Sequence, residues 1–366
     1  VENETINSID AKGKIFRSSI MQVRRKPFEG TVYHIKLASG IELTCTGNHP
    51  LYSYSKGLHK QEAKDLREGQ FLATPSKLER DSFADEPELA YWSGMLHGDG
   101  HVEDRHRVRV KNGRPYICKD GSINLYTEEP ETIPRFVQFM KEQLDNAHVG
   151  TVEPRPEKQC YEAHVSGFER SKTIQSLLDI PAGNRHEVKM SNSHFTADLR
   201  SFVAGFFDAE GHVDLENNAL VFTNANEQYI DFFRYALLTE GIVAQKYEST
   251  SPNSRWWRLY IYGLDQVRLF ASLYPIRHEA KVTKLSELIT KKVIPNTNVD
   301  VIPCNDEIIS LLSHAKEKGV SNREIARRAG LSQGLLNFIK RKERNLSQTS
   351  VRKLVSVFEK MDLNVE

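Results

Sequence analysis

Two stretches of this 366-residue chain repeat one pattern, and this repeat limits what the chain can fold into more than any other feature. Residues 92–100 read WSGMLHGDG and residues 203–211 read VAGFFDAEG, so that each has two small residues four positions apart, then an acid, then a glycine. The small pairs are Gly94 with Gly98 and Gly205 with Ala209. Positions four apart share a helix face, and missing side chains there let two backbones approach closely. The repeat therefore predicts two helices packed against each other.

The acids of the repeat, Asp99 and Glu210, stand where a helix ends. A carboxylate in the last turn faces the negative end of the helix dipole, and two packed helices would also bring both carboxylates together. A divalent cation would relieve both penalties. We expect a metal site formed by these acids and the residues just before them, Gly98 and Ala209. Gly100 and Gly211 are expected to end the helices in the left-handed conformation.

This doublet resembles the two signature motifs of single-chain LAGLIDADG homing endonucleases. The resemblance implies a site-specific endonuclease that hydrolyses both strands of a long double-stranded DNA target, with Asp99 and Glu210 as catalytic residues. Phosphodiester hydrolysis needs a nucleophilic water, charge relief at phosphorus and a stabilised leaving oxygen, which metal ions held by paired carboxylates supply. Ligands that offer only oxygen suit Mg²⁺, or Mn²⁺ in its place.

The resemblance also implies one catalytic lysine from each half of the site. The best matches are Lys189 and Lys281, which end the related pentapeptides RHEVK (185–189) and RHEAK (277–281). Lys284 is the alternative in the second half.

The region around the motifs, residues 86–297, reads as an internally duplicated α+β domain. Each pseudo-repeat, 86–190 and 195–292, predicts the order αββαββα with the motif helix first. In the first copy the two leading strands are expected near 106–110 and 122–126, separated by turns at Asn112-Gly113 and Asp120-Gly121. A duplication with its chemistry at the same point of each copy implies a pseudo-twofold site in a monomer, which matches the twofold relation between the strands of DNA.

Basic and amide side chains alternate along these predicted strands, as they do on a sheet face that lies on a duplex. The candidate DNA-binding residues are Arg107, Arg109, Lys111, Asn224, Asn226, Lys246, Arg255 and Arg258, with Tyr260 beside them.

Residues 1–80 predict a small all-β domain of short strands. The segment from Thr46 to His49, with the stretch that follows it, resembles the TxxH block of the intein (Hint) fold, in which the Thr and His assist the first acyl shift. We expect Thr46 and His49 to be vestiges of splicing, because the chain begins with Val1 where splicing needs Cys or Ser, and it does not end in His-Asn.

Residues 300–366 predict an all-α domain. Ser321 to Glu324 reads as a capping box before one helix, and a second helix follows Gly330. The pattern resembles the helix-turn-helix of phage-repressor-like domains, which implies that this domain also binds DNA. Its expected base contacts are Gln333, Gly334 and Asn337, and its expected phosphate contacts are Lys340, Arg341 and Lys342.

Composition fits an intracellular protein that is not secreted and has no membrane part. Apolar residues make up 39% of the chain and charged residues 27%, and its four cysteines form no CxxC pair. The formal net charge of +1 does not argue for or against DNA binding, because acids elsewhere can offset a basic face.

Two other functions fit parts of the pattern. A DNA-binding transcription regulator can join a LAGLIDADG-like domain to a helix-turn-helix without cutting DNA, although it would have no use for two packed carboxylates. An intron RNA maturase is the third possibility, and the intein-like N-terminal segment disfavours it.

Overall fold

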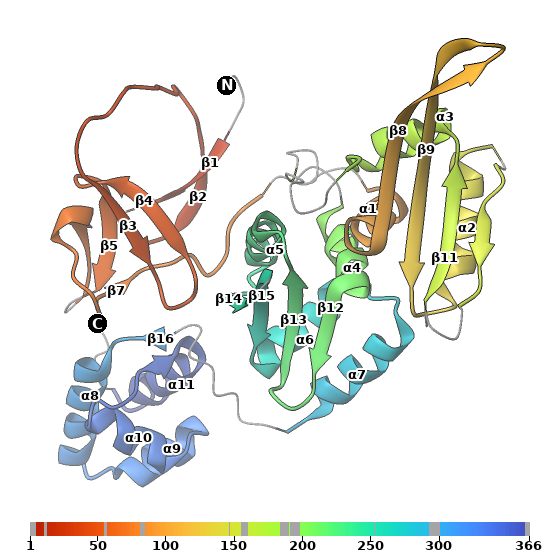
Figure 1. The fold of residues 1–366 in the computed structure, drawn as a ribbon. Coiled ribbons are helices and arrows are strands. Elements are labelled where there is room, and N and C mark those ends of the chain that lie inside the picture. Colours follow the sequence, from red (N-terminus) through yellow and green to blue (C-terminus); the bar gives the residue numbers. More distant parts are fainter. Residues whose placement is uncertain are drawn as a thin grey trace. The chain divides into compact units, whose positions relative to one another are not determined.

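The computed structural model describes residues 5–10, 13–54, 57–80, 85–145, 147–154, 160–183, 190, 198–252, 254–292 and 301–362. The chain forms two compact units, each assembled from separate stretches (Figure 1). One unit comprises residues 6–18 and 77–295, and the other comprises residues 1–5, 19–76 and 296–366. Within the described ranges, no helix is both long and apolar enough to cross a membrane.

The first unit contains the duplicated region, and the predicted order αββαββα occurs twice in it. The first copy consists of α1 (Pro87–Asp99), β8 (Gly100–Lys111), β9 (Arg114–Thr127), α2 (Thr132–Gln143), β10 (Gly150–Val152), β11 (Tyr161–Ser166) and α3 (Phe168–Leu178). The second consists of α4 (Leu199–Glu210), β12 (Gly211–Asp214), β13 (Ala219–Asn224), α5 (Glu227–Thr239), β14 (Gln245–Ser251), β15 (Ser254–Tyr262) and α6 (Leu264–Leu273). A further helix, α7 (Glu279–Thr290), follows the second copy.

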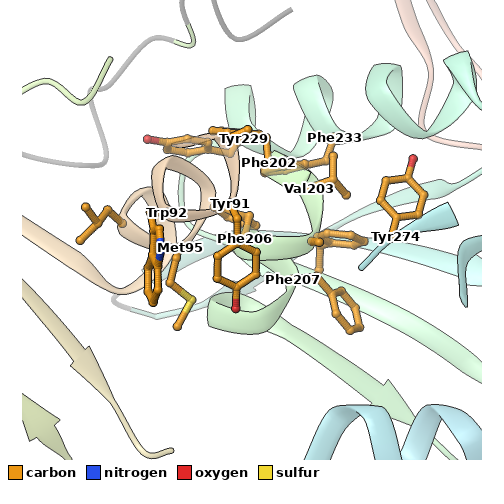
Figure 2. Close-up of a cluster of buried hydrophobic side chains, with 14 of the residues drawn as sticks. Tyr91, Trp92, Met95, Phe202, Val203, Phe206, Phe207, Tyr229, Phe233 and Tyr274 are labelled. Carbon is orange, nitrogen blue, oxygen red and sulfur yellow. The ribbon is translucent and has the colours of Figure 1, made fainter. Parts of the chain in front are cut away.

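Each copy builds an antiparallel four-stranded sheet, ordered β10-β11-β9-β8 in the first and β12-β13-β15-β14 in the second. Helices α1 and α4 lie next to each other between the two sheets (Figure 1). Their apolar side chains join both copies into one core, in which Trp92, Met95, Phe202 and Phe206 are almost completely buried (Figure 2). Large aromatic rings fill much of this core, and each buries more surface than an aliphatic side chain.

The leading hairpins of the two copies differ in length. Strands β8 and β9 have 12 and 14 residues, whereas β12 and β13 have four and six. The hairpin turns at Asn112 and Gly113, both with positive φ, as predicted. The second predicted turn was wrong, because Asp120 and Gly121 lie inside β9. Gly121 packs closely there, since a Cβ atom on it would lie 3.0 Å from Phe168 Cα of α3.

The N-terminal β strands form small separate sheets. Strands β1 (Thr5–Ile9) and β2 (Ile15–Ser19) make one hairpin, β3 (Val32–Lys36) and β4 (Glu42–Thr46) another, and β5 (Pro50–Tyr54) lies between β6 (Leu58–Glu62) and β7 (Phe71–Leu72). A short 3₁₀ helix, η1 (Ala63–Asp65), follows β6. Ala63 is the one buried hydrophobic residue in the described ranges 13–54 and 57–80, and Phe16, Phe28, Val32 and Phe71 are exposed. These strands therefore have almost no core of their own.

The C-terminal region is helical and has its own core. It contains β16 (Val301–Ile302), α8 (Asn305–Glu317), α9 (Asn322–Ala329), α10 (Gln333–Lys340), β17 (Leu346–Ser347) and α11 (Gln348–Glu359). The Ser321 hydroxyl caps α9 by accepting a hydrogen bond from the Glu324 N–H, as predicted, and Gly330 ends that helix in the left-handed conformation. The carboxylate of Glu324 does not complete a capping box, because it pairs with Arg327 and Arg328.

Candidate metal and nuclease site

Helices α1 and α4 contact each other backbone to backbone. A Cβ atom on Gly94 would lie 2.0 Å from the Phe202 carbonyl oxygen, and one on Gly205 would lie 2.0 Å from the Tyr91 carbonyl oxygen. One turn further on, a Cβ atom on Gly98 would lie 2.3 Å from the Ala209 Cβ atom. The reciprocal contacts follow the predicted pseudo-twofold relation and leave no room for larger side chains.

This packing brings the two predicted acids to the same end of the helix pair. Asp99 is the last residue of α1 and Glu210 is the last of α4, and both are half-buried. The Glu210 Cγ atom lies 3.2 Å from the position of a Cβ atom on Gly98, the residue before Asp99. The two carboxylates therefore extend from adjacent helix ends, as the sequence predicts.

The glycines after the acids do not adopt the predicted left-handed conformation. Gly100 and Gly211 are extended, with φ of −80° and −83°. They are required for space, because a Cβ atom on either would lie 2.4 Å from the carbonyl oxygen four residues earlier. The chain thus passes directly from each helix into a strand.

Lys281 of α7 lies against the end of α4. Its ammonium donates hydrogen bonds to the carbonyl oxygens of Phe207 at 2.9 Å, Asp208 at 2.6 Å and Ala209 at 3.3 Å. Burial lowers the pKa of Lys281, and the negative charges of Asp208, Asp99 and Glu210 oppose that shift. A lysine here neutralises the negative end of the helix where the carboxylates gather.

Asp208 supports this arrangement from inside the core. Its Oδ2 atom accepts hydrogen bonds from the Tyr91 hydroxyl at 2.8 Å and the Arg277 N–H at 2.7 Å. Burial raises the pKa of Asp208 to about 6, against the effects of the Arg277 N–H, the Tyr91 hydroxyl and the Lys281 charge. Sequence reasoning missed Asp208, although its place two residues before Glu210 could have drawn attention to it.

The other lysines differ in position. Lys189 lies outside the described residues, so its assignment stays a prediction. Lys284, the alternative to Lys281, is exposed on α7. The charge of Lys281 interacts with both acids.

The predicted basic face of the first copy is present on one side of the β8–β9 hairpin. Arg107, Arg109 and Lys111 are exposed and share the strand face opposite to the buried Val102. Asp120 of β9 lies 4.0 Å from Arg107 and 3.5 Å from Arg109. Arg105 and Arg114, which sequence reasoning missed, belong to the same face by their strand register.

The candidates of the second copy divide between the two faces of its sheet. Arg258 and Tyr260 share the half-exposed side with Tyr247, whose ring contacts Tyr260 edge-on at 5.5 Å. Lys246 has the opposite orientation, with its side chain 8% exposed and paired to Glu227 at 2.7 Å and Asp231 at 2.9 Å. The prediction of Lys246 as a DNA contact was therefore wrong, because its strand position points it toward α5.

Three other candidates of this copy have structural contacts. Asn226 is 5% exposed and caps α5 by accepting from the Gln228 N–H, and Asn224 accepts from the Asn226 N–H at 2.8 Å. These contacts overturn the predicted DNA role of Asn226 and occupy the Asn224 amide oxygen. Arg255 pairs with Glu248 at 2.6 Å at the exposed end of β15.

Most candidates outside the duplicated domain are exposed, and Thr46 is half-buried. On α10 and just after it, Gln333, Gly334, Asn337, Lys340, Arg341 and Lys342 all face solvent. His49 is also exposed, and the Thr46 hydroxyl donates to the Asn48 side chain at 2.7 Å within the same turn.

No group of three or more His, Cys, Asp or Glu side chains that could hold a metal ion occurs in the described part of the chain. A metal at the helix ends would therefore rest on the Asp99 and Glu210 carboxylates and backbone carbonyls, with water or substrate oxygens as further ligands. Oxygen donors of this kind fit Mg²⁺, which keeps several waters.

Comparison with known proteins agrees with the second motif and the sheet that follows it. Residues 197–274 match the family described as LAGLIDADG-like domain. The matched LAGLIDADG-like segment contains α4, with Glu210, and the whole second sheet.

Three similar proteins illustrate the range of matches. A replication factor C small subunit of Thermococcus kodakarensis is 25% identical over 85% of this chain, and an ATP-dependent DNA helicase of Methanocaldococcus jannaschii is 23% identical over 74%. The chain spans 33% of the first protein and 23% of the second. A crystal structure of I-DmoI in complex with DNA and Ca shares 17% identity and a TM-score of 0.40, over 54% of this chain and 97% of that one.

Proposed function

We propose that this chain is a site-specific homing endonuclease that hydrolyses both strands of a long double-stranded DNA target with a divalent metal, Mg²⁺ or Mn²⁺. The observation that carries the proposal is the packing of α1 on α4, which places Asp99 and Glu210 at adjacent helix ends. Two carboxylates gathered at the negative ends of two helices form a cluster of oxygen donors that favours a divalent cation, and Lys281 adds a positive charge beside it. An active site accounts for this arrangement better than a purely structural role.

The residues around the acids have separable roles. Asp99 and Glu210, with the carbonyls of Gly98 and Ala209, would hold the metal, which supplies an activated water and charge relief at phosphorus. Lys281 fixes the end of α4 and adds a positive charge beside the reacting phosphate. Lys189 would serve the first half in the same way.

The proposed DNA contacts start from the basic face of the β8–β9 hairpin, with Arg107, Arg109 and Lys111 on phosphates and base edges. The second sheet adds Arg258 and Tyr260, and Arg255 at its rim. The exposed side of α10, with Gln333, Asn337, Lys340 and Arg341, would read one flank of the target as a helix-turn-helix.

An intein origin is supported by the kinds of protein that match. A replication factor C subunit and a helicase have different activities, yet most of this chain aligns with a minor part of each. A segment shared in this way fits a mobile insertion better than a part of either activity. Thr46 and His49 would then be remnants of the splicing domain.

Cleavage of a plasmid library tests the proposal. The library carries genomic fragments of the source organism, and the coding sequence of this chain is removed from the fragment that contains it, which restores the uninterrupted site. We expect the protein to linearise a specific plasmid with Mg²⁺ or Mn²⁺ but not with EDTA, and the Asp99→Asn and Glu210→Gln variants to bind the same plasmid without cutting it. Specific binding by the natural protein without cleavage in either metal would favour the rival function, a non-cutting regulator. Selective binding of RNA over DNA would favour a maturase.

A further inference from the structure

The two halves of the proposed site differ in the polar contacts behind their acids. Counting back from the acids, His97 of the first motif is equivalent to Asp208 of the second, and Tyr91 is equivalent to Phe202. The pseudo-twofold axis therefore pairs two contacts. Tyr91 donates a hydrogen bond to Asp208 at 2.8 Å, whereas on the other side the His97 ring meets the Phe202 ring at 5.5 Å.

Arg277 extends the contact on the Asp208 side. Its N–H donates to Asp208, its guanidinium carbon lies 3.9 Å from the centroid of the Tyr91 ring, and its nitrogens reach Glu88 at 2.6 and 3.0 Å. One residue thus holds the start of α1, the middle of α1 and the end of α4. Arg277 also begins the pentapeptide that ends in Lys281.

The same pentapeptide has a second anchor. The Glu279 N–H donates to Glu129 Oε1 at 2.6 Å, and His278 lies 3.3 Å from the same oxygen. The Glu129 carboxylate is itself held by the Thr132 hydroxyl at 3.1 Å. Residues 277–279 are therefore fixed at both ends before α7 presents Lys281 to the α4 carbonyls.

We propose that Tyr91, Asp208 and Arg277 form a clamp that positions Lys281, and that this clamp acts on only one of the two strand cuts. On the other side of the pseudo-twofold axis, His97 of α1 and Phe202 of α4 stand where the clamp has a carboxylate and a hydroxyl, so the other half cannot build the same contact. His97 instead bonds the Tyr229 hydroxyl of α5 at 2.8 Å, on a different element from the pentapeptide. Tyr91, Asp208 and Arg277 are positioning residues. The inference rests on the proposed nuclease function only for the effect of the clamp on cutting.

The first test follows the two cuts separately. A supercoiled plasmid with one target site is cut under single-turnover conditions, and the conversion to nicked and then to linear DNA is timed. Tyr91→Phe loses the hydrogen bond to Asp208, and Asp208→Asn loses the negative charge that strengthens it. Each variant should slow one cut by about tenfold or more, so that nicked DNA accumulates while DNA affinity is unchanged. If the rates of the two cuts fall equally, or if neither changes, the proposal that the clamp acts on one cut is overturned.

A matched control separates positioning from general loss of stability. Arg200 lies at the start of α4 and pairs with Glu240 at 2.9 Å, away from the helix end that holds Glu210. Arg200→Met should lower the thermal midpoint without changing the ratio of the two cuts. An equal accumulation of nicked DNA in this variant would also contradict the clamp.

A second test does not depend on cleavage. A short pulse of acetic anhydride, read by mass spectrometry, should label Lys281 slowly in the natural protein and several-fold faster in Tyr91→Phe and Asp208→Asn. Lys291, which donates to the Asn218 side chain at 3.1 Å elsewhere in the same unit, should stay protected in all of them. Unchanged labelling of Lys281 would overturn the clamp even if the protein cuts DNA, whereas faster labelling in a protein that does not cut would leave the clamp standing and the proposed nuclease function refuted.

Discussion

Lys281 and Lys284 are one helical turn apart on α7 but differ in surroundings. Lys281 donates to three carbonyls at the end of α4, and Lys284 is exposed. Lys281→Met should slow cleavage by about a hundredfold while weakening binding little, because a charge fixed beside the phosphate acts mainly on the transition state. Lys284→Met is the matched control and should leave both unchanged. Parallel loss of binding and cleavage in Lys281→Met would instead make Lys281 a DNA contact.

Gly94 shows how little space the helix interface leaves. A Cβ atom added there would meet backbone at 2.0 Å, so Gly94→Ala must separate α1 from α4 and should cost about 2 kcal/mol or more of the free energy of unfolding. Gly334, in α10, has only the Ser332 hydroxyl oxygen at 4.0 Å, so Gly334→Ala should be neutral or stabilise by about 0.5 kcal/mol. Urea unfolding of both variants checks this contrast, and equal effects would contradict the close helix contact.

Among the elements, the β8–β9 hairpin carries a basic face that includes Arg107, Arg109 and Lys111. Arg107→Ala with Arg109→Ala should lower DNA affinity and reduce the slope of log affinity against log salt by about two, one for each phosphate that is no longer neutralised. Lys246→Met is the control, because its buried pairing with Glu227 and Asp231 should affect stability and leave the salt slope unchanged. A slope that changes in Lys246→Met and not in the hairpin variant would reverse the assignment of the sheet faces.

The pair of Arg200 and Glu240 links the start of α4 to the end of α5 through hydrogen bonds of 3.0 and 2.9 Å. The Arg200 guanidinium lowers the pKa of Glu240, so this carboxylate binds protons less readily in the folded than in the unfolded state. Its contribution to stability is therefore present above the pKa of an unfolded glutamate, about 4.3, and is lost as the pH falls through the lower folded value.

Glu240→Gln should consequently reduce the free energy of unfolding by about 1 kcal/mol at pH 7, and the difference from the natural protein should shrink as the pH falls below the pKa of an unfolded glutamate, about 4.3. Thermal unfolding at a series of pH values measures this difference. A difference that grows as the pH falls would mean that the pair does not stabilise the folded state.

At the scale of the whole molecule, the two large cores share no residue. One core draws on α1 to α7 and their sheets, and the other lies within residues 304–358. Removing residues 300–366 should therefore leave the duplicated domain folded, with an unchanged unfolding midpoint. It should also weaken DNA binding, reduce the salt slope and relax base preference on one flank of the target.

Several outcomes would contradict this prediction. If affinity and salt slope are unchanged after truncation, the C-terminal helices do not bind DNA. If the duplicated domain unfolds, the two cores depend on each other. The hydroxyl of Tyr54, which bonds Glu307 of α8 at 2.7 Å, would lose its partner, so local changes near β5 are expected in either case.

Features that depend on local pattern could be predicted from the sequence. The spacing of Gly94 and Gly98, and of Gly205 and Ala209, was sufficient to predict the helix pair and the carboxylates at its end. The alternating and helical patterns after each motif predicted the element order of both copies. Helical periodicity sets these features. The Ser321 cap on α9 was also predictable, because it is a hydrogen bond between near neighbours in the sequence.

The contacts of individual polar side chains could not be predicted without the folded structure. Alternation along β14 suggested that Lys246 would face DNA, but strand register turned it toward two carboxylates on α5. The role of Asp208 depends on Tyr91 and Arg277, which are distant in sequence and meet it only through the packing of α1, α4 and the segment before α7. Pairings of this kind follow from three-dimensional packing, which local periodicity does not encode.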